Sequence, residues 1–77
     1  MKVAFDFRRL EGRIVERFGT RSAFAEKAGF TKSQLSARLT NKVDFDLSEI
    51  YELCTPELLD ISVTDIPAYF FIPRSSV

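Results

Sequence analysis

The side chains best placed to do chemistry lie in residues 20–42, TRSAFAEKAGFTKSQLSARLTNK. Their pattern predicts two short amphipathic helices joined by a tight turn that contains Gly29. The second helix opens with small polar and basic side chains instead of apolar ones. Hydroxyl, amide and ammonium groups on an exposed helix can hydrogen-bond to base edges and phosphates. This layout is typical of a helix-turn-helix, whose second helix enters the major groove of DNA.

Other kinds of chemistry lack the residues they need. The chain has no histidine, no glycine-rich phosphate loop and no nucleophile beside a partner base, so we expect no enzymatic activity and no small-molecule substrate. Cys54 is the only cysteine, which excludes an intrachain disulfide. One thiol and scattered carboxylates do not make a closed ligand set, so neither a metal nor another cofactor is expected.

The net charge of zero hides an uneven distribution. Residues 1–42 contain ten basic and four acidic side chains, whereas residues 43–77 contain one and seven, giving net charges of +6 and −6. A basic half that coincides with the predicted helix-turn-helix is the electrostatic pattern of a DNA-facing surface. The alternative is that these are ordinary solvated basic faces.

Length and composition bound the organisation of the chain. Its 77 residues make one domain, and 45% hydrophobic residues, including eight Phe, are ample for a compact core. We expect residues 1–77 to form this single domain, with a core over about 6–72 and a frayed tail at 73–77. No signal peptide and no membrane-spanning run is seen, so a cytoplasmic protein without membrane contact is expected.

The elements that must position the polar side chains are predicted to be helices. Leu10, Ile14 and Phe18 recur every four residues in a first helix that Asp6 caps and Gly19 ends. A second helix runs over about 21–28 and a third over about 32–40, where Thr31 and Gln34 fit a capping box. The fold class is therefore all-α, a compact bundle of about five short helices with the helix-turn-helix at the second and third.

The acidic half supplies the remaining predicted helices. Asp46 and Glu49 form a second capping box, before a helix expected to turn four side chains inward. Those four are Leu47, Ile50, Tyr51 and Cys54. Thr55 and Pro56 start a short turn, and Ser62, Thr64 and Asp65 offer a last helix start, with Pro67 in its first turn. Phe70 is expected in the core, while Phe71 and Ile72 are left open between core and a dimer contact.

Helix packing gives the helix-turn-helix a physical basis. Ala25 falls where the two helices cross closely, and a larger side chain there would push them apart. Gly29 occupies a turn position at which the backbone needs a positive φ angle. Phe24 and Leu35 hold the pair against the core. A generic αα-hairpin would satisfy the same packing rules and remains the structural alternative.

At these residues the chain resembles a known family. Phe24-Ala25, Gly29 and the ending Thr40-Asn41-Lys42 resemble the helix-turn-helix of phage repressor and Cro-like proteins, which have a lambda-repressor-like fold. Residues 59–63 and 66–70 resemble the end of the same five-helix domain. The whole chain is similar to small helix-turn-helix proteins of streptococcal and lactococcal prophages. One departure is Asn41, because the family usually has glycine before the final lysine.

The resemblance implies sequence-specific binding to double-stranded DNA and a role in transcription regulation. It implies base-reading roles for Lys32, Ser33, Gln34, Ser36 and Ala37. It implies phosphate contacts for Thr20, Arg21, Thr31, Arg38, Asn41 and Lys42. Two of these have structural alternatives, since Arg38 could lie along its helix and Ser36 could be a small residue at a packing point.

Two questions about partners stay open in the sequence. A domain of this size buries little DNA surface, so specific binding usually needs two copies on a two-fold site. The C-terminal apolar segment, Tyr69 to Ile72, could provide a homodimer contact, by its side chains or as a short edge strand. The alternative function is a small phage-derived protein-interaction module, an accessory or anti-repressor factor without specific DNA binding.

Overall fold

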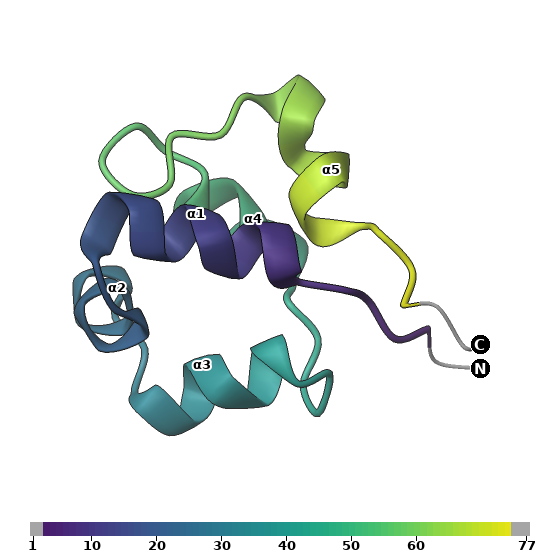
Figure 1. The fold of residues 1–77 in the computed structure, drawn as a ribbon, viewed down its shortest axis with the longest axis horizontal. Helices are drawn as coiled ribbons and strands as arrows, with labels where there is room; N and C mark the ends of the chain where they lie inside the picture. The colour runs from purple at the N-terminus through teal and green to yellow at the C-terminus, as the bar shows by residue number, and fades with distance from the viewer. Residues whose placement is uncertain (1–2, 75–77) are drawn as a thin grey trace.

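The computed structural model describes residues 3–74, and these form an all-α fold, as predicted (Figure 1). Five α-helices and one 3-10 turn follow each other along the chain. Their bounds are α1 Arg8–Phe18, α2 Arg21–Ala28, α3 Lys32–Leu39, α4 Leu47–Leu53, η1 Val63–Asp65 and α5 Ile66–Phe70. Residues 3–74 contain no β-strand beyond one isolated antiparallel bridge between Phe5 and Pro73.

The helix ends follow the local sequence closely. Both predicted capping boxes are present: Thr31 Oγ1 accepts from Gln34 N at 3.0 Å, and Asp46 Oδ1 accepts from Glu49 N at 2.7 Å. Gly19 follows α1 with a φ of 84°. A side-chain cap of this kind is worth about 1 kcal/mol, so local sequence fixes where these helices begin.

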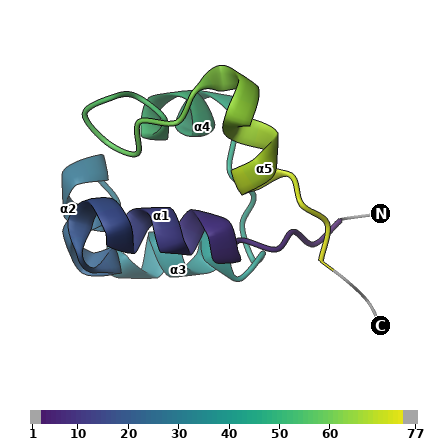
Figure 2. The ribbon, with the colours of Figure 1, turned by 45° about the horizontal axis from the view of Figure 1, so that its top comes forward.

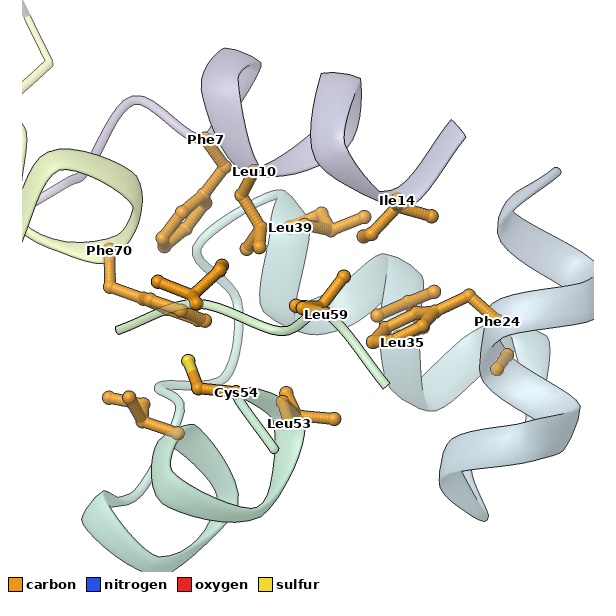
Figure 3. Close-up of a cluster of buried hydrophobic side chains, with 13 residues drawn as sticks. Phe7, Leu10, Ile14, Phe24, Leu35, Leu39, Leu53, Cys54, Leu59 and Phe70 are labelled. Atoms are coloured by element: carbon orange, nitrogen blue, oxygen red, sulfur yellow. The ribbon is translucent and has the colours of Figure 1, made fainter. Parts of the chain in front are cut away.

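The core lies between α1 and the other helices (Figure 3). Leu10 and Ile14 of α1 pack with Phe24 of α2, Leu35 of α3 and the loop residue Leu59, all exposed by 2% or less. The other buried side chains are Phe7, Ala25, Leu39, Ile50, Leu53, Cys54, Ile61 and Phe70. They form one cluster, to which all five helices contribute.

Two arginines of α1 fasten the loop that follows α4. Arg13 donates from Nε to Leu59 O at 2.9 Å and from Nη2 to Asp60 O at 3.0 Å. Arg17 donates to Leu58 O at 3.0 Å and to Pro56 O at 2.9 Å. These bonds satisfy carbonyls that no helix uses, because residues 55–60 form turns instead of a helix. The predicted short turn at Pro56 is confirmed.

The prediction that α4 buries Leu47 and Tyr51 is wrong. Ile50, Leu53 and Cys54 are buried, but Leu47 is 80% and Tyr51 is 68% exposed. Side chains three and four residues apart share a helix face, and Ile50, Leu53 and Cys54 form that face against the core. Leu47 and Tyr51 lie on the neighbouring face, where no other element covers them.

The chain ends meet beside α5. Asp6 N donates to Ile72 O at 2.7 Å and Arg74 N donates to Ala4 O at 2.9 Å, on either side of the Phe5–Pro73 bridge. The predicted frayed tail is therefore wrong at Pro73 and Arg74, and its residues 75–77 lie outside the described part. Phe70 is buried as predicted, whereas Phe71 is 43% exposed and Ile72 is half-buried. No helix within residues 3–74 has the length and apolarity to cross a membrane.

Candidate nucleic-acid interface

The α2–α3 pair has the geometry that the sequence predicts for it. Ala25 and Phe24 of α2 and Leu35 of α3 are each exposed by 2% or less and belong to one core cluster. Gly29 ends α2 with a left-handed φ of 84°, and Phe30 N donates to Ala25 O at 2.8 Å to close the turn. A Cβ on residue 29 would meet nothing within 4 Å, so the glycine is needed for its φ angle and not for space.

The exposed face of α3 carries the predicted base-reading residues. Leu35 and Leu39 are buried on the opposite face of α3, so the polar side chains of α3 point outward. Lys32, Ser33, Gln34 and Ser36 are exposed, and Ala37 is half-buried. A shallow hollow is lined by Lys32, Ser33, Ser36, Ala37, Thr40 and Lys42. The structure thus gathers four of the five predicted base-reading residues on one surface.

Gln34 lies apart from this hollow. Its side-chain Oε1 accepts a hydrogen bond from Thr31 N at 2.9 Å, as part of the capping box. The amide oxygen is therefore used in holding the start of α3. Thr40 belongs to the hollow but was not predicted; its Oγ1 donates to Ser36 O at 2.8 Å. The signal that would have found it is its spacing, four residues after Ser36 on the same helix face.

Arg21 lies beside the start of α3, although it belongs to α2. It lines a second hollow together with Ser22, Lys32, Leu35 and Ser36. Its guanidinium also meets the Glu11 carboxylate, with 3.3 Å between Nη2 and Oε1. The Arg21 side chain is 55% exposed, so this ion pair is screened by solvent and leaves the guanidinium accessible to another anion.

The two threonines predicted to contact phosphate are both helix caps. Thr20 Oγ1 accepts from Ala23 N at 3.1 Å, and Thr31 Oγ1 accepts from Gln34 N at 3.0 Å. Both residues are exposed. A hydroxyl that accepts at a cap keeps its own hydrogen, which it can donate to a phosphate oxygen. Their predicted role is therefore compatible with capping.

Arg38 is not available as predicted, because other groups of the protein engage its guanidinium. It donates to Glu49 through Nε at 3.0 Å and through Nη2 at 2.8 Å, and to Gln34 O through Nη1 at 3.0 Å. The guanidinium also lies 4.7 Å from the centre of the Phe30 ring. Its side chain is only 15% exposed. The phosphate role implied for Arg38 is therefore withdrawn, and its alternative position along the helix is the one observed.

Asn41 is likewise engaged, and in a way that explains the departure from the family pattern. Its φ of 66° is left-handed, the conformation that the usual glycine would take, and asparagine tolerates it better than most residues. Its side chain forms two hydrogen bonds with Phe5: Phe5 N donates to Oδ1 at 2.9 Å and Nδ2 donates to Phe5 O at 3.0 Å. These bonds leave the second Nδ2 hydrogen unused, so the phosphate contact implied for Asn41 stays a prediction.

The positive charge that remains accessible is smaller than the net +6 of residues 1–42 indicates. Arg13, Arg17 and Arg38 are held by internal carbonyls or carboxylates. Lys27, Lys32 and Lys42 are exposed and make no ion pair within residues 3–74. Lys32 and Lys42 line the α3 hollow, so the accessible charge is modest but lies where the predicted reading surface lies.

Within the described residues, no group of three or more His, Cys, Asp or Glu side chains could hold a metal ion. Burial raises the pKa of the Cys54 thiol to about 11, so this thiol stays protonated at neutral pH and packs as a small apolar group.

Comparisons with known proteins agree with the fold. One of two matching solved chains is the modulator of repression (MOR) of the temperate bacteriophage TP901-1 from Lactococcus lactis, determined in solution. It is 34% identical, with a TM-score of 0.76 over 87% of this chain and 88% of that chain. No curated protein matches the chain. The relation to a phage protein is thus confirmed, whereas membership of the wider repressor and Cro-like family stays a prediction.

A family described as "Protein of unknown function (DUF739)" matches residues 3–72. This range includes all five helices and Phe5, and it ends one residue before Pro73, the bridge partner of Phe5. Because the match spans nearly the whole described chain, the protein belongs to this family.

Proposed function

We propose that this chain is a regulator that binds double-stranded DNA sequence-specifically, with α3 in the major groove. The observation that carries the proposal is the hollow lined by Lys32, Ser33, Ser36, Ala37, Thr40 and Lys42. It lies on a helix held from behind by two buried leucines and approached on one side by Arg21. A polar, partly basic helix face on a rigid support is what major-groove readout requires.

The roles within the proposed interface differ by side chain. Lys32 can donate to guanine O6 and N7, Ser33 and Ser36 can donate or accept, and the Ala37 methyl suits a thymine methyl. Gln34 keeps only its amide NH₂ for a base. Phosphate contacts fall to Arg21, Asn41 and Lys42, with the hydroxyls of Thr20 and Thr31. These short side chains discriminate bases weakly, so positioning by phosphate matters more.

Selection from a random duplex library tests this function, followed by a salt titration of the best sequence. We expect an enriched sequence, and a slope of log K against log salt of about −2 to −3 per bound chain, because only two or three cations face the DNA. If no sequence is enriched, or if affinity does not respond to salt, DNA binding is refuted.

Specific binding by so small a chain calls for a second copy, and we propose a homodimer through the C-terminal apolar segment. Phe71 supports it, being 43% exposed and in edge-to-face contact with Phe5 at 6.0 Å. Strand pairing across the two-fold axis is disfavoured, since Pro73 on the ribbon edge has no N–H to donate. Sedimentation equilibrium of the wild type and Phe71→Ser tests the contact: both monomeric would contradict it.

The second candidate is an accessory factor that acts on a repressor without specific DNA binding of its own. The observation in its favour is the name of the 34% identical phage protein, a modulator of repression. The test adds the chain to a phage repressor bound to its operator and follows gel mobility. A changed repressor–operator complex, in the absence of any complex between chain and operator alone, would favour this candidate over DNA binding.

A further inference from the structure

A groove away from α3 carries two of the three most exposed large apolar side chains of the described residues, Tyr51 and Val63. Its walls are the end of α4, residues 54–56, and residues 60–66 including η1, with Tyr51, Ile61, Val63 and Ile66 among its lining. Tyr51 is 68% and Val63 is 70% exposed, and Leu47, one helical turn before Tyr51, is 80% exposed. Figure 1 places α3 and residues 55–63 on opposite sides of α1, and Figure 2 shows the same loop above α1, with α3 partly hidden behind α1.

The groove is formed by a restrained segment and not by a loose loop. Arg13 and Arg17 hold four carbonyls of residues 56–60 from the α1 side. Leu59 is fully buried and Ile61 is 6% exposed, so the segment is anchored to the core on both sides of Asp60. A pre-organised surface loses little conformational entropy when a partner binds, which favours binding.

The rim of the groove is acidic. Asp60 and Asp65 line it, and Glu52 on α4 and Glu57 in the turn are exposed nearby in sequence. None of these four carboxylates forms an ion pair with another residue in the range 3–74. The groove therefore combines uncovered apolar side chains with two lining carboxylates, Asp60 and Asp65, that form no ion pair within residues 3–74.

From this combination we infer that the groove binds a basic amphipathic segment of another protein, with apolar side chains seated between Tyr51 and Val63 and Lys or Arg side chains over the acidic rim. Apolar contacts supply the affinity of such docking, and complementary charge supplies speed and selectivity. DNA is excluded as the occupant because the rim carboxylates repel phosphate. The inference concerns a face distinct from α3 and does not depend on DNA binding.

The α3 surface of a second copy does not offer the required chemistry. The hollow that holds Lys32 and Lys42 contains small side chains, Ser33, Ser36, Ala37 and Thr40, and no large apolar one. Arg13, Arg17 and Arg38 are held by carbonyls or carboxylates of the same molecule. The occupant that we infer is therefore a segment of a different protein, and a second copy is the alternative that the test below excludes.

A random peptide display selection with the full chain as bait tests the inference. Counter-selection uses the double variant Tyr51→Ser/Val63→Ser, whose substituted side chains are exposed and so leave the core intact. The matched control is Val15→Ser, at an exposed valine of α1 outside the groove lining. We expect enriched peptides with Lys or Arg flanking apolar residues, bound at least tenfold more weakly by the double variant and equally by Val15→Ser.

Three outcomes would overturn the inference: no enriched peptide, enriched peptides without basic residues, or equal binding to the double variant. A chain dimer in sedimentation that Tyr51→Ser/Val63→Ser disperses would also overturn it, since the groove would then hold a second copy. A second variant pair, Asp60→Asn/Asp65→Asn, removes the charge of the two carboxylates that line the groove. We expect it to weaken peptide binding at low salt and to match the wild type at about 1 M salt, where screening is nearly complete.

The failure of DNA binding and the failure of this inference are distinguishable in one further measurement. The enriched peptide is titrated into the chain alone and into the chain saturated with its selected duplex. We expect the same peptide affinity in both, because residues 55–63, which include much of the groove lining, and α3 lie on opposite sides of α1 in Figure 1. Competition between peptide and duplex would place the peptide on α3 and contradict the groove.

Discussion

Arg38 of α3 and Glu49 of α4 form a two-point ion pair, with Nε to Oε1 at 3.0 Å and Nη2 to Oε2 at 2.8 Å. Glu49 at the same time completes the capping box of α4, because Asp46 N donates to its Oε1 at 3.1 Å. One carboxylate therefore joins the end of α3 to the start of α4. The orientation of the exposed α3 face depends on this junction as well as on the leucines beneath it.

The Arg38–Glu49 pair should make stability fall in acid. Hydrogen bonding from Arg38 lowers the pKa of Glu49 below its ordinary 4.5. A carboxyl whose pKa is lower in the folded state contributes stability above its unfolded pKa, and loses it as pH falls through the folded one. We expect the difference in unfolding free energy between wild type and Glu49→Gln to be largest near neutral pH and to shrink below about pH 4.5, measured by urea unfolding. A gap independent of pH would contradict the ion pair.

Two substitutions of Asn41 should distinguish the cost of its left-handed backbone from the loss of its side-chain hydrogen bonds. Asn41→Gly keeps the φ of 66° without strain but loses both hydrogen bonds to Phe5, whereas Asn41→Ala loses the bonds and adds a Cβ in the left-handed region. We expect both variants to be destabilised, with Ala worse than Gly by about 1–2 kcal/mol. Urea unfolding measures this, and equal losses would show that the φ angle costs nothing.

Lys32 and Arg21 should differ in what they contribute to DNA binding, if the proposed function is correct. Lys32→Ala is expected to relax preference at one base position by about 1–3 kcal/mol. Arg21→Ala is expected to weaken all sequences alike and to reduce the salt slope by about 1. The measurement is the affinity of each variant for single-base variants of the selected site. If both substitutions weaken binding to every site equally, Lys32 and Arg21 do not have the different roles proposed.

Substitution by alanine should destabilise the protein at Leu59 but hardly at Leu47, although both leucines lie within residues 43–77. Leu59 is fully buried in a turn and Leu47 is 80% exposed on a helix. Leu59→Ala is expected to cost about 2–5 kcal/mol because it opens a cavity in the core. Leu47→Ala is expected to stay within about 0.5 kcal/mol in thermal or urea unfolding. A large loss at Leu47 would mean that its face is covered.

The sequence alone determined the helices and the starts of α3 and α4, because capping and periodicity are local, whereas α1 and α5 have no side-chain cap. Thr31 with Gln34, Asp46 with Glu49, and the positive φ of Gly29 depend on neighbours a few residues away. The outward placement of Lys32 and Ser36 was also predictable, since Leu35 and Leu39 fix which face of α3 is buried.

Only the tertiary structure decided which charged and polar groups stay accessible. Arg38 meets Glu49 eleven residues away and Asn41 meets Phe5 thirty-six residues away, so no local pattern reveals that either side chain is engaged. The same holds for Leu47 and Tyr51, which are exposed because no other element packs on their side of α4. Helix formation is a local property, whereas accessibility depends on what the rest of the chain places opposite each side chain.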